Sequence, residues 1–412
     1  MNVLITCQYY WPDNFLINEI AEELVKKGNK VTVLTGLPDY ATTKIPKKYK
    51  FGKNRHEYHN GVEIIRVPII ARHHGFIMRV INYLSYFINS SLYVLTHKFD
   101  KYDIIYAYQL APILMVNPGI IIKKKYNIPM FLYVLDLWPD QMKIWNVNEK
   151  NLLYKIMLKY CKKAYNSGDK VGITSRPFKD YLINVCDVDE SKIIYLPQHS
   201  SSMDIKNTKP KKNQITNFVF AGNIGQQQNI ECIIKAVSLM ETTKPFLVNI
   251  YGEGTSYKRC IEYSKELRVD DKIKFYGRVP KEKLNDIYPK MDAFLLTLCS
   301  EKEIGFVANT VPAKLQNYMS GGKPILAAID GGAKEIIEES KCGAVVPSGD
   351  YKAYAELLDD FIEDKEKYKE CGKNAVKYFN ENFEKNIVMD KLEKELNKIA
   401  DKNKLEGVKK WK

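Results

Sequence analysis

A short segment closed by two glycines carries the clearest chemistry in the chain. It runs from Val311 to Leu326 with the sequence VPAKLQNYMSGGKPIL, which predicts a helix that feeds a buried strand. The first turn of a helix has unpaired N–H groups and the positive end of the helix dipole, and both attract anions. Lys314 lies in that turn and adds a full charge. The segment predicts a site for a nucleotide diphosphate, and a solvated surface lysine is the alternative.

Other candidates follow predicted strands, because ligands of open parallel sheets bind beyond the carboxyl ends of the strands. Asp136 ends the apolar run 130–136 and is the leading catalytic candidate of the first half, with capping of the following turn as an equal alternative. In the second half, the loop 221–225 holds Gly222, Asn223 and Gly225, and its glycines allow close backbone approach to a phosphate. The turn 252–254, which contains Gly252, is either another turn that approaches a phosphate or a plain loop.

The loop after the first strand is rich in aromatic residues. Tyr10 and Trp11 could stack on a sugar ring, although packing of Trp11 in the structure is at least as favoured. Asp13 or Asn14 could cap the next helix.

Several kinds of site are disfavoured by missing motifs. The chain has no GxGxxG at either domain start, no GxxxxGK[ST], no HExxH, no GxSxG, and no His/Cys cluster with zinc spacing. We therefore expect neither a metal nor a cofactor.

Length and composition indicate the number of domains, the kind of partner and the cellular compartment. A chain of 412 residues exceeds one ordinary core and favours two domains. The net charge of +14 favours anionic partners such as nucleic acid, acidic lipid or phosphorylated substrates. The eight cysteines form no CxxC pair and indicate a reduced, cytoplasmic protein, and the N-terminus resembles a first strand rather than a signal peptide.

Short apolar runs alternate with helical patterns in both halves, which predicts an α/β fold with parallel sheets. The strands expected in the first half are 3–6, 30–35, 62–67, 103–108, 130–136, 171–175 and 193–196, with helices at 16–27, 111–125 and 152–165. In the second half the strands expected are 218–221, 246–251, 273–276, 293–298, 324–328 and 344–347. The predicted domains are residues 1–198 and 215–383, joined by a polar linker at 199–214, and the helical tail 384–412 is expected to pack back on the first domain.

The stretch 76–97 has helical periodicity but contains Arg79 and several Asn and Ser residues, so it is too polar to span a bilayer. Arg66, Arg72, His73 and His74 precede it. Two interpretations remain open, a core helix with basic caps and an interfacial membrane helix.

The order of several motifs resembles the family 4 glycosyltransferases. The matching segments are 8–12, 31–38, 136–139, 175–176, 195–198, 220–225, 251–254, 277–279 and 312–324, and they span nearly the whole chain. The Gln-aromatic-Trp-Pro opening and the Pro-x-Lys-x-Gln helix are most similar to N-acetyl-L-fucosamine transferases of surface polysaccharide assembly.

This resemblance implies a GT-B fold, in which two Rossmann-like domains face each other across a cleft. The second domain would hold a sugar nucleotide and the first an acceptor, without a divalent metal and with retention of anomeric configuration. The donor-site residues it implies are Gly222, Asn223, Gly225, Gln228, Gly252, Gly277, Arg278, Val279, Asn309, Pro312, Ala313, Gln316 and Asn317. Asp136 and Lys314 would be catalytic, and the acceptor would contact Tyr10, Trp11, Asn14 and Trp138.

The chain departs from the family pattern at four of these positions. The paired glutamates of the family fall on Asn309 and Asn317, and the second of them would normally bind ribose. The cations that hold the diphosphate fall on Asn223 and Gln228. An amide can exchange hydrogen bonds but brings no charge, so Lys314 is left as the main cation.

We expect a UDP-type donor, a polyprenyl-diphosphate-linked or oligosaccharide acceptor in capsule or O-antigen synthesis, and contact with the anionic inner face of the membrane. Two alternatives remain. A sugar-nucleotide 2-epimerase could use the same fold, and a nucleic-acid-binding protein would fit the net charge, although the lysines are dispersed and no binding module is recognised.

Overall fold

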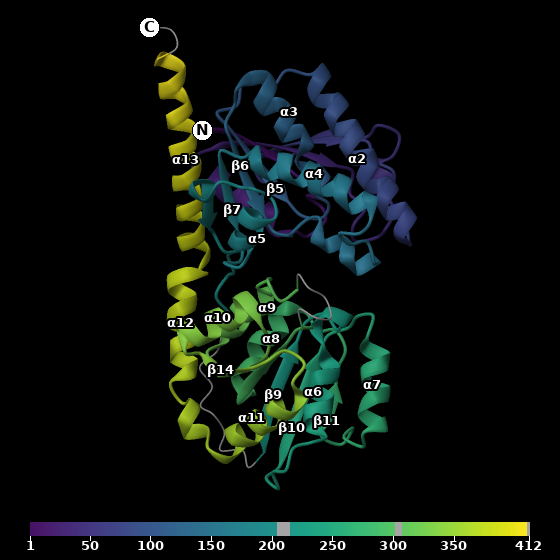
Figure 1. Cartoon of the computed structure of the whole chain (residues 1–412), viewed down its shortest axis with the longest axis vertical. Coiled ribbons are helices and arrows are strands. Elements are labelled where there is room, and N and C mark those ends of the chain that lie inside the picture. Colours follow the sequence, from purple (N-terminus) through teal and green to yellow (C-terminus); the bar gives the residue numbers. More distant parts are fainter. Residues whose placement is uncertain (204–214, 301–306, 410–412) are drawn as a thin grey trace. The chain divides into compact units, whose positions relative to one another are not determined.

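The computed structural model describes residues 1–203, 215–300 and 307–409 and divides into two compact units (Figure 1). Unit 1 comprises Met1–Thr174, Phe178–Leu196 and Met389–Lys412, and unit 2 comprises Ser175–Pro177 and Pro197–Val388. Residues 199–203 of the expected linker therefore belong to unit 2, and residues 204–214 lie outside the described part.

Unit 1 is built on a sheet with the strand order β3-β4-β2-β1-β5-β6-β7-β8. Its strands are β1 (Asn2–Thr6), β2 (Lys30–Gly36), β3 (His56–His59), β4 (Val62–Val67), β5 (Ile104–Gln109), β6 (Met130–Val134), β7 (Lys170–Ile173) and β8 (Ile193–Tyr195). All neighbours pair in parallel except β3 and β4. The sequence prediction missed β3, because this edge strand has the polar sequence HEYH and no apolar run to reveal it.

The helices of unit 1 are α1 (Leu16–Lys26), α2 (Phe76–Thr96), α3 (Asn117–Tyr126), α4 (Leu152–Asn166) and α5 (Phe178–Asn184). The helix expected from residue 111 begins later, because the short 3-10 helix Ile113–Val116 precedes α3 and Pro118 lies in the first turn of α3. Among the described residues, no helix is both long and apolar enough to cross a bilayer.

Unit 2 contains a fully parallel sheet with the order β11-β10-β9-β12-β13-β14. Its strands are β9 (Thr216–Ala221), β10 (Phe246–Tyr251), β11 (Ile273–Phe275), β12 (Ala293–Thr297), β13 (Ile325–Ala328) and β14 (Gly343–Val346). Its helices are α6 (Ile230–Val237), α7 (Tyr257–Glu266), α8 (Lys281–Ile287), α9 (Ala313–Gly321), α10 (Gly331–Ser340), α11 (Tyr351–Glu363) and α12 (Cys371–Asn382). Because β9 has β10 on one side and β12 on the other, the strand order reverses there, which is where open sheets bind ligands.

Two apolar layers cover the sheet of unit 2. Buried side chains of α6, α7 and α11 pack on one face, and those of α9, α10 and α12 pack on the other. Lys314, in the first turn of α9, lies against Gly222, the residue directly after β9.

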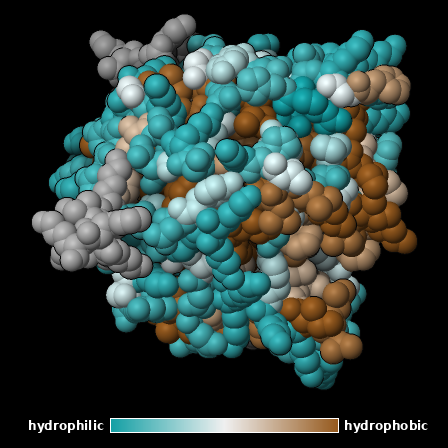
Figure 2. All heavy atoms as spheres, turned by 90° about the horizontal axis from the view of Figure 1, so that it is seen from above, coloured by the Kyte–Doolittle hydropathy of each residue, from teal (hydrophilic) through white to brown (hydrophobic). Residues whose placement is uncertain are grey.

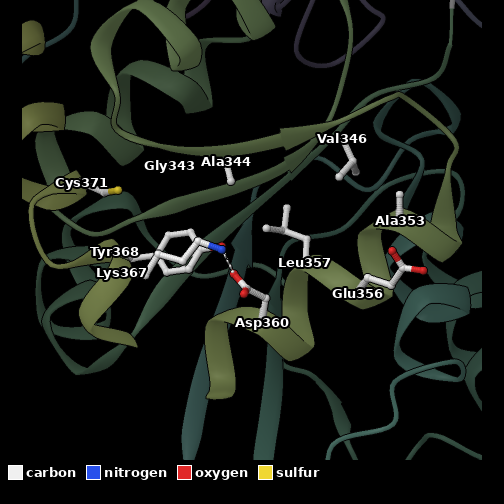
Figure 3. A pocket seen from close by; sticks show the side chains of 10 residues that line it. All are labelled: Gly343, Ala344, Val346, Ala353, Glu356, Leu357, Asp360, Lys367, Tyr368 and Cys371. Carbon is white, nitrogen blue, oxygen red and sulfur yellow. Dashed lines mark hydrogen bonds and ion pairs between the residues drawn. The ribbon is translucent and has the colours of Figure 1, made fainter. Parts of the chain in front are cut away.

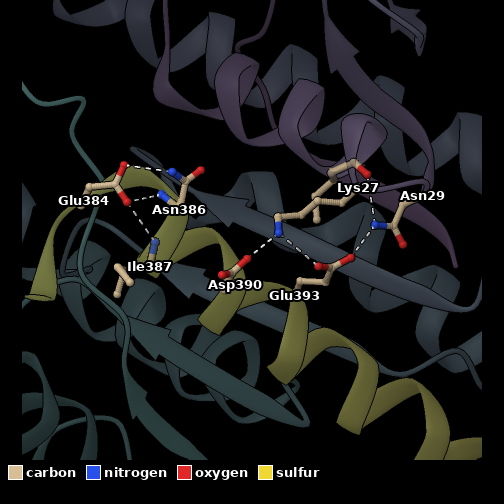
Figure 4. Close-up of polar contacts among 8 residues, drawn as sticks. Lys27, Asn29, Glu384, Asn386, Ile387, Asp390 and Glu393 are labelled. Carbon is tan, nitrogen blue, oxygen red and sulfur yellow. Dashed lines mark hydrogen bonds and ion pairs between the residues drawn. The ribbon is translucent and has the colours of Figure 1, made fainter. Parts of the chain in front are cut away.

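The last helix, α13 (Lys385–Lys409), passes from unit 2 into unit 1. In unit 1, Lys27 forms ion pairs with Asp390 and, at 3.6 Å, with Glu393, and Asn29 donates to Glu393 at 3.0 Å (Figure 4). Leu392 and Leu396 are buried. From Met389 onward, the described part of α13 belongs to unit 1.

Candidate functional site

A cavity of about 940 Å³ lies in unit 2, walled by the loops after β9, β10 and β11 and by the start of α9. A volume of this size accommodates a small-molecule ligand or cofactor. The expected catalytic residue Lys314 lines it, together with most residues of the expected donor site: Gly222, Asn223, Gln228, Gly252, Arg278, Val279, Pro312, Ala313 and Asn317.

Glycines bring the loops after β9 and β10 into contact at this cavity. A Cβ on Gly252 would lie 1.8 Å from the carbonyl oxygen of Gly222, so no other residue fits there without movement of the backbone. The Gly222 N–H donates to the Tyr251 carbonyl at 2.9 Å. The Ile224 N–H donates to the Glu253 carbonyl, also at 2.9 Å. This part of the wall is therefore closely packed backbone.

Lys314 brings positive charge into the cavity. Its ammonium lies 4.3 Å from the ring centroid of Phe220 and donates a hydrogen bond to Oε1 of Gln228. The residue is half-buried, with its charged end enclosed, and burial lowers the pKa of Lys314 to about 7. No carboxylate of the described residues pairs with it, so the ammonium is available to an anionic ligand.

The start of α9 adds its dipole to this charge. Pro312 occupies the N-cap position, and no side chain in the described part of the chain caps the helix. The N–H groups of Ala313 and Lys314 therefore remain for a ligand.

Polar side chains further along α9 are already engaged. Asn317 lines the cavity, but its Oδ1 accepts a hydrogen bond from the Ser200 hydroxyl at 3.0 Å. Gln316 is buried and donates to the Gln198 carbonyl at 2.8 Å. Within the cavity, α9 thus contributes a cation and backbone N–H groups but no carboxylate.

Three further residues of the expected donor site do not line the cavity: Gly225, Gly277 and Asn309. Gly277 accepts the Gly252 N–H at 2.8 Å and so couples the loops after β10 and β11. Asn309 is half-buried.

Sequence reasoning missed several wall residues, among them Tyr251, Glu253 and Tyr288. Tyr251 stacks on Tyr276 with ring centroids 4.5 Å apart. The turn that holds Glu253 was visible in the sequence, but only the sheet order shows that it lies between the loops after β9 and β11.

In unit 1, Asp136 lies just after β6 and is half-buried. Burial raises the pKa of its carboxyl to about 6, and hydrogen bonds from Gln141 and the Ala111 N–H partly oppose that rise. The carboxylate is a stronger base than an ordinary aspartate, yet it is mainly ionised at pH 7.

The residues expected to contact an acceptor differ in exposure. Tyr10 and Trp138 are buried, the ring of Trp11 stacks on His59 with centroids 3.8 Å apart, and Asn14 is exposed. Of these four residues, Asn14 and the half-buried Trp11 have surface that a ligand can reach.

Neither Asp13 nor Asn14 caps α1, because the N-cap is Phe15 and no side chain bonds there. The Asp13 carboxylate instead accepts backbone N–H groups of Tyr40 at 3.1 Å and Ala41 at 3.0 Å. It therefore ties the loop after β2 to the loop after β1.

A second cavity, of about 520 Å³, lies between β14 and α11 (Figure 3). Two of its charged groups pair with each other, because Asp360 accepts a hydrogen bond from Lys367 at 2.6 Å, and Asp360 also accepts one from the Tyr368 hydroxyl at 2.6 Å. Among the described residues, no group of His, Cys, Asp and Glu is placed to hold a metal ion.

Comparison with known proteins shows which protein family the two halves of the chain match. Residues 15–198 match the family model "Glycosyltransferase Family 4", and residues 202–378 match "Glycosyl transferases group 1". Two curated relatives are a probable glycosyltransferase, WbjE, of Pseudomonas aeruginosa, 25% identical over 56% of this chain, and the lipopolysaccharide 1,6-galactosyltransferase of Escherichia coli K12, 26% identical over 48%. The matches span 59% and 51% of those relatives' own lengths.

Solved structures share the fold across almost the whole chain. Anabaena HepE in complex with UDP and glucose has a TM-score of 0.68 at 14% identity and covers 97% of this chain and 100% of its own. Sucrose-phosphate synthase of Thermosynechococcus elongatus has a TM-score of 0.72 at 15% identity, with coverages of 96% and 98%. The predicted GT-B fold class is confirmed.

Proposed function

Because this chain is a glycosyltransferase of the family 4 type, we propose that its unit 2 cavity binds a nucleoside diphosphate sugar whose glycosyl group is transferred to an acceptor hydroxyl. The observation that carries this proposal is Lys314. An ammonium that no carboxylate of the described residues neutralises lies beside the first N–H groups of α9, in a cavity of about 940 Å³, and this arrangement matches a leaving diphosphate.

We propose UDP as the nucleotide, and HepE, which shares the fold, is solved with UDP. The base lies against the backbone of the loop 277–279, and the diphosphate lies against Gly222, Ala313 and Lys314. The bond between the anomeric carbon and the diphosphate oxygen breaks as the acceptor oxygen bonds to that carbon, with retention of configuration. Asp136 of unit 1 orients the acceptor hydroxyl or takes its proton, because its raised pKa makes it a suitable base.

The pathway we propose is surface polysaccharide synthesis. Curated relatives include a lipopolysaccharide galactosyltransferase and a putative colanic acid glycosyltransferase of Escherichia coli. The motifs similar to N-acetyl-L-fucosamine transferases favour an N-acetylated deoxyhexosamine as the donor sugar. A saccharide on a polyprenyl diphosphate is the acceptor we favour.

Such an acceptor lies at a membrane, and unit 1 has a surface that suits one. We define the α2–α4 patch by its exposed apolar residues Ile77, Leu84, Ile88, Leu92 and Leu95 of α2 and Leu152, Leu153 and Ile156 of α4. Figure 2 shows hydrophobic residues gathered on one side of the molecule, the side on which Figure 1 places α2. Phe87 and Tyr160, with ring centroids 6.3 Å apart, join the two helices.

Charge around the α2–α4 patch favours an acidic lipid surface. Neither α2, α3 nor α4 contains an acidic residue, whereas Lys125, Lys155 and Lys159 are exposed on α3 and α4. Apolar side chains flanked by lysines are typical of interfacial helices. We propose that this patch rests on the cytoplasmic leaflet.

The experiment is turnover with a panel of nucleotide sugars and lipid-linked acceptors, read by product mass. Lys314→Ala should lower kcat roughly 100- to 1000-fold, the usual cost of removing one group that stabilises a developing negative charge. Asp136→Asn should lower kcat by a similar factor. Lys341→Ala, which removes an exposed lysine of the same unit outside the cavity, is the control and should change kcat little.

Wild-type turnover by the Lys314→Ala variant would contradict the proposal. Conversion of the sugar nucleotide with no acceptor present would instead favour the epimerase alternative.

A further inference from the structure

The cavity of unit 2 contains one carboxylate among its described lining residues, that of Glu253. This side chain is exposed, and it forms no ion pair or side-chain hydrogen bond with the other described residues. A carboxylate without a partner is unexpected in a cavity whose other charged groups are Lys314 and Arg278, because it would repel a phosphate placed next to it.

The backbone holds this carboxylate in place. Glu253 stands between Gly252 and Gly254. A Cβ added to Gly252 would lie 1.8 Å from the Gly222 carbonyl oxygen, and a Cβ added to Gly254 would lie 2.4 Å from the Ile224 carbonyl oxygen. Both neighbours must therefore be glycine, and Glu253 is the only side chain that this turn can present. Its carbonyl also accepts the Ile224 N–H at 2.9 Å. A side chain on so constrained a turn is preorganised for a ligand.

The carboxylate lies beside the loop after β11. A Cβ on Gly277 would be 3.7 Å from Glu253 Oε1, whereas Lys314 lies against Gly222 in the loop after β9. Because the sheet order is β11-β10-β9, the turn with Glu253 comes between those two loops. A ligand whose phosphates meet Lys314 would present a different group to Glu253.

An ionised carboxylate only accepts hydrogen bonds, so it selects a group with several donors, such as vicinal hydroxyls. Asn317, which falls where the family pattern has its ribose-binding glutamate, brings no charge, and its amide oxygen already accepts a hydrogen bond from Ser200. We propose that Glu253 binds the ribose hydroxyls of the nucleoside diphosphate. This inference rests on the proposed function and names the residue that recognises the sugar of the nucleotide.

Calorimetric titration of UDP and of 2′,3′-dideoxy-UDP into the whole protein tests it. The wild type should bind UDP roughly 10- to 100-fold more tightly than the dideoxy compound, the range of hydrogen bonds to a charged group. In Glu253→Gln the ratio of the two affinities, UDP over the dideoxy compound, should fall to about 3 or less. The affinity for the dideoxy compound itself should change little. Glu262→Gln on α7, exposed and outside the cavity, is the matched control and should keep the wild-type ratio.

The inference and the proposed function fail in different ways. If Glu253→Gln binds UDP with the wild-type ratio, Glu253 does not recognise ribose, and the proposed function stands. If neither UDP, GDP, ADP nor CDP binds the wild type, both are overturned. The double variant Glu253→Gln/Asn317→Glu adds a second test, because a carboxylate restored on α9 should recover part of the ratio.

Discussion

At the scale of single residues, Lys314 links the fold of unit 2 to its chemistry. The same enclosure that places its ammonium beside Phe220 also lowers its pKa to about 7. Without a bound anion, Lys314 therefore loses its proton at a much lower pH than an ordinary lysine and is mostly neutral at pH 8. A bound diphosphate favours the charged form and should raise this pKa.

Proton uptake on ligand binding follows from this shift. At pH 8, where UDP is fully ionised, binding should take up nearly one proton per site, and UDP affinity should fall as the pH rises from 7 to 9. Calorimetry in phosphate and in Tris buffers measures the uptake. Lys314→Arg keeps the charge but cannot lose its proton, so it should bind UDP with no uptake. Equal uptake by the wild type and Lys314→Arg would assign the proton to another group.

At the scale of elements, the contact between the loops after β9 and β10 decides whether the cavity forms. Gly252 has a φ of 143°, and a Cβ there would overlap the Gly222 carbonyl. Two requirements, the backbone conformation and the close approach, meet at this one residue.

Gly252→Ala should destabilise the protein by roughly 2–4 kcal/mol and abolish UDP binding. Gly349→Ala is the matched control, because Gly349 also has a positive φ, 77°, but no atom lies within 4 Å of its added Cβ. The control should lose only about 1 kcal/mol. Urea unfolding measures both changes, and equal losses would show that the close approach contributes nothing.

At the scale of the whole molecule, the proposed association with a membrane depends on exposed apolar area and on net charge together. The chain carries +14, and the α2–α4 patch lies on helices without acidic residues. Neither feature alone distinguishes a membrane from other anionic partners.

Flotation with phosphatidylglycerol vesicles at low salt should recover the wild type, and neutral vesicles or high salt should not. Ile88→Glu/Leu92→Glu should reduce binding at least about tenfold, because two side chains can no longer enter the bilayer interface. Leu239→Glu, at an exposed apolar position of unit 2, should leave flotation unchanged. Flotation of the Ile88→Glu/Leu92→Glu variant at the wild-type level would show that the α2–α4 patch does not contact the membrane.

What the sequence by itself determined is the set of elements and the motifs between them. Apolar runs and helical periods are local, so they predicted every strand of the described residues except the polar edge strand β3, and they located the helix that carries Lys314. The tertiary structure alone decided which of these motifs meet. Side-chain pairing depends on sheet order and on close backbone contact, which no local pattern encodes. For that reason only the folded chain shows that the Ser200 hydroxyl donates to the amide oxygen of Asn317 and that Tyr10 is buried. It also shows that Glu253 lines the cavity with no ion-pair partner among the described residues.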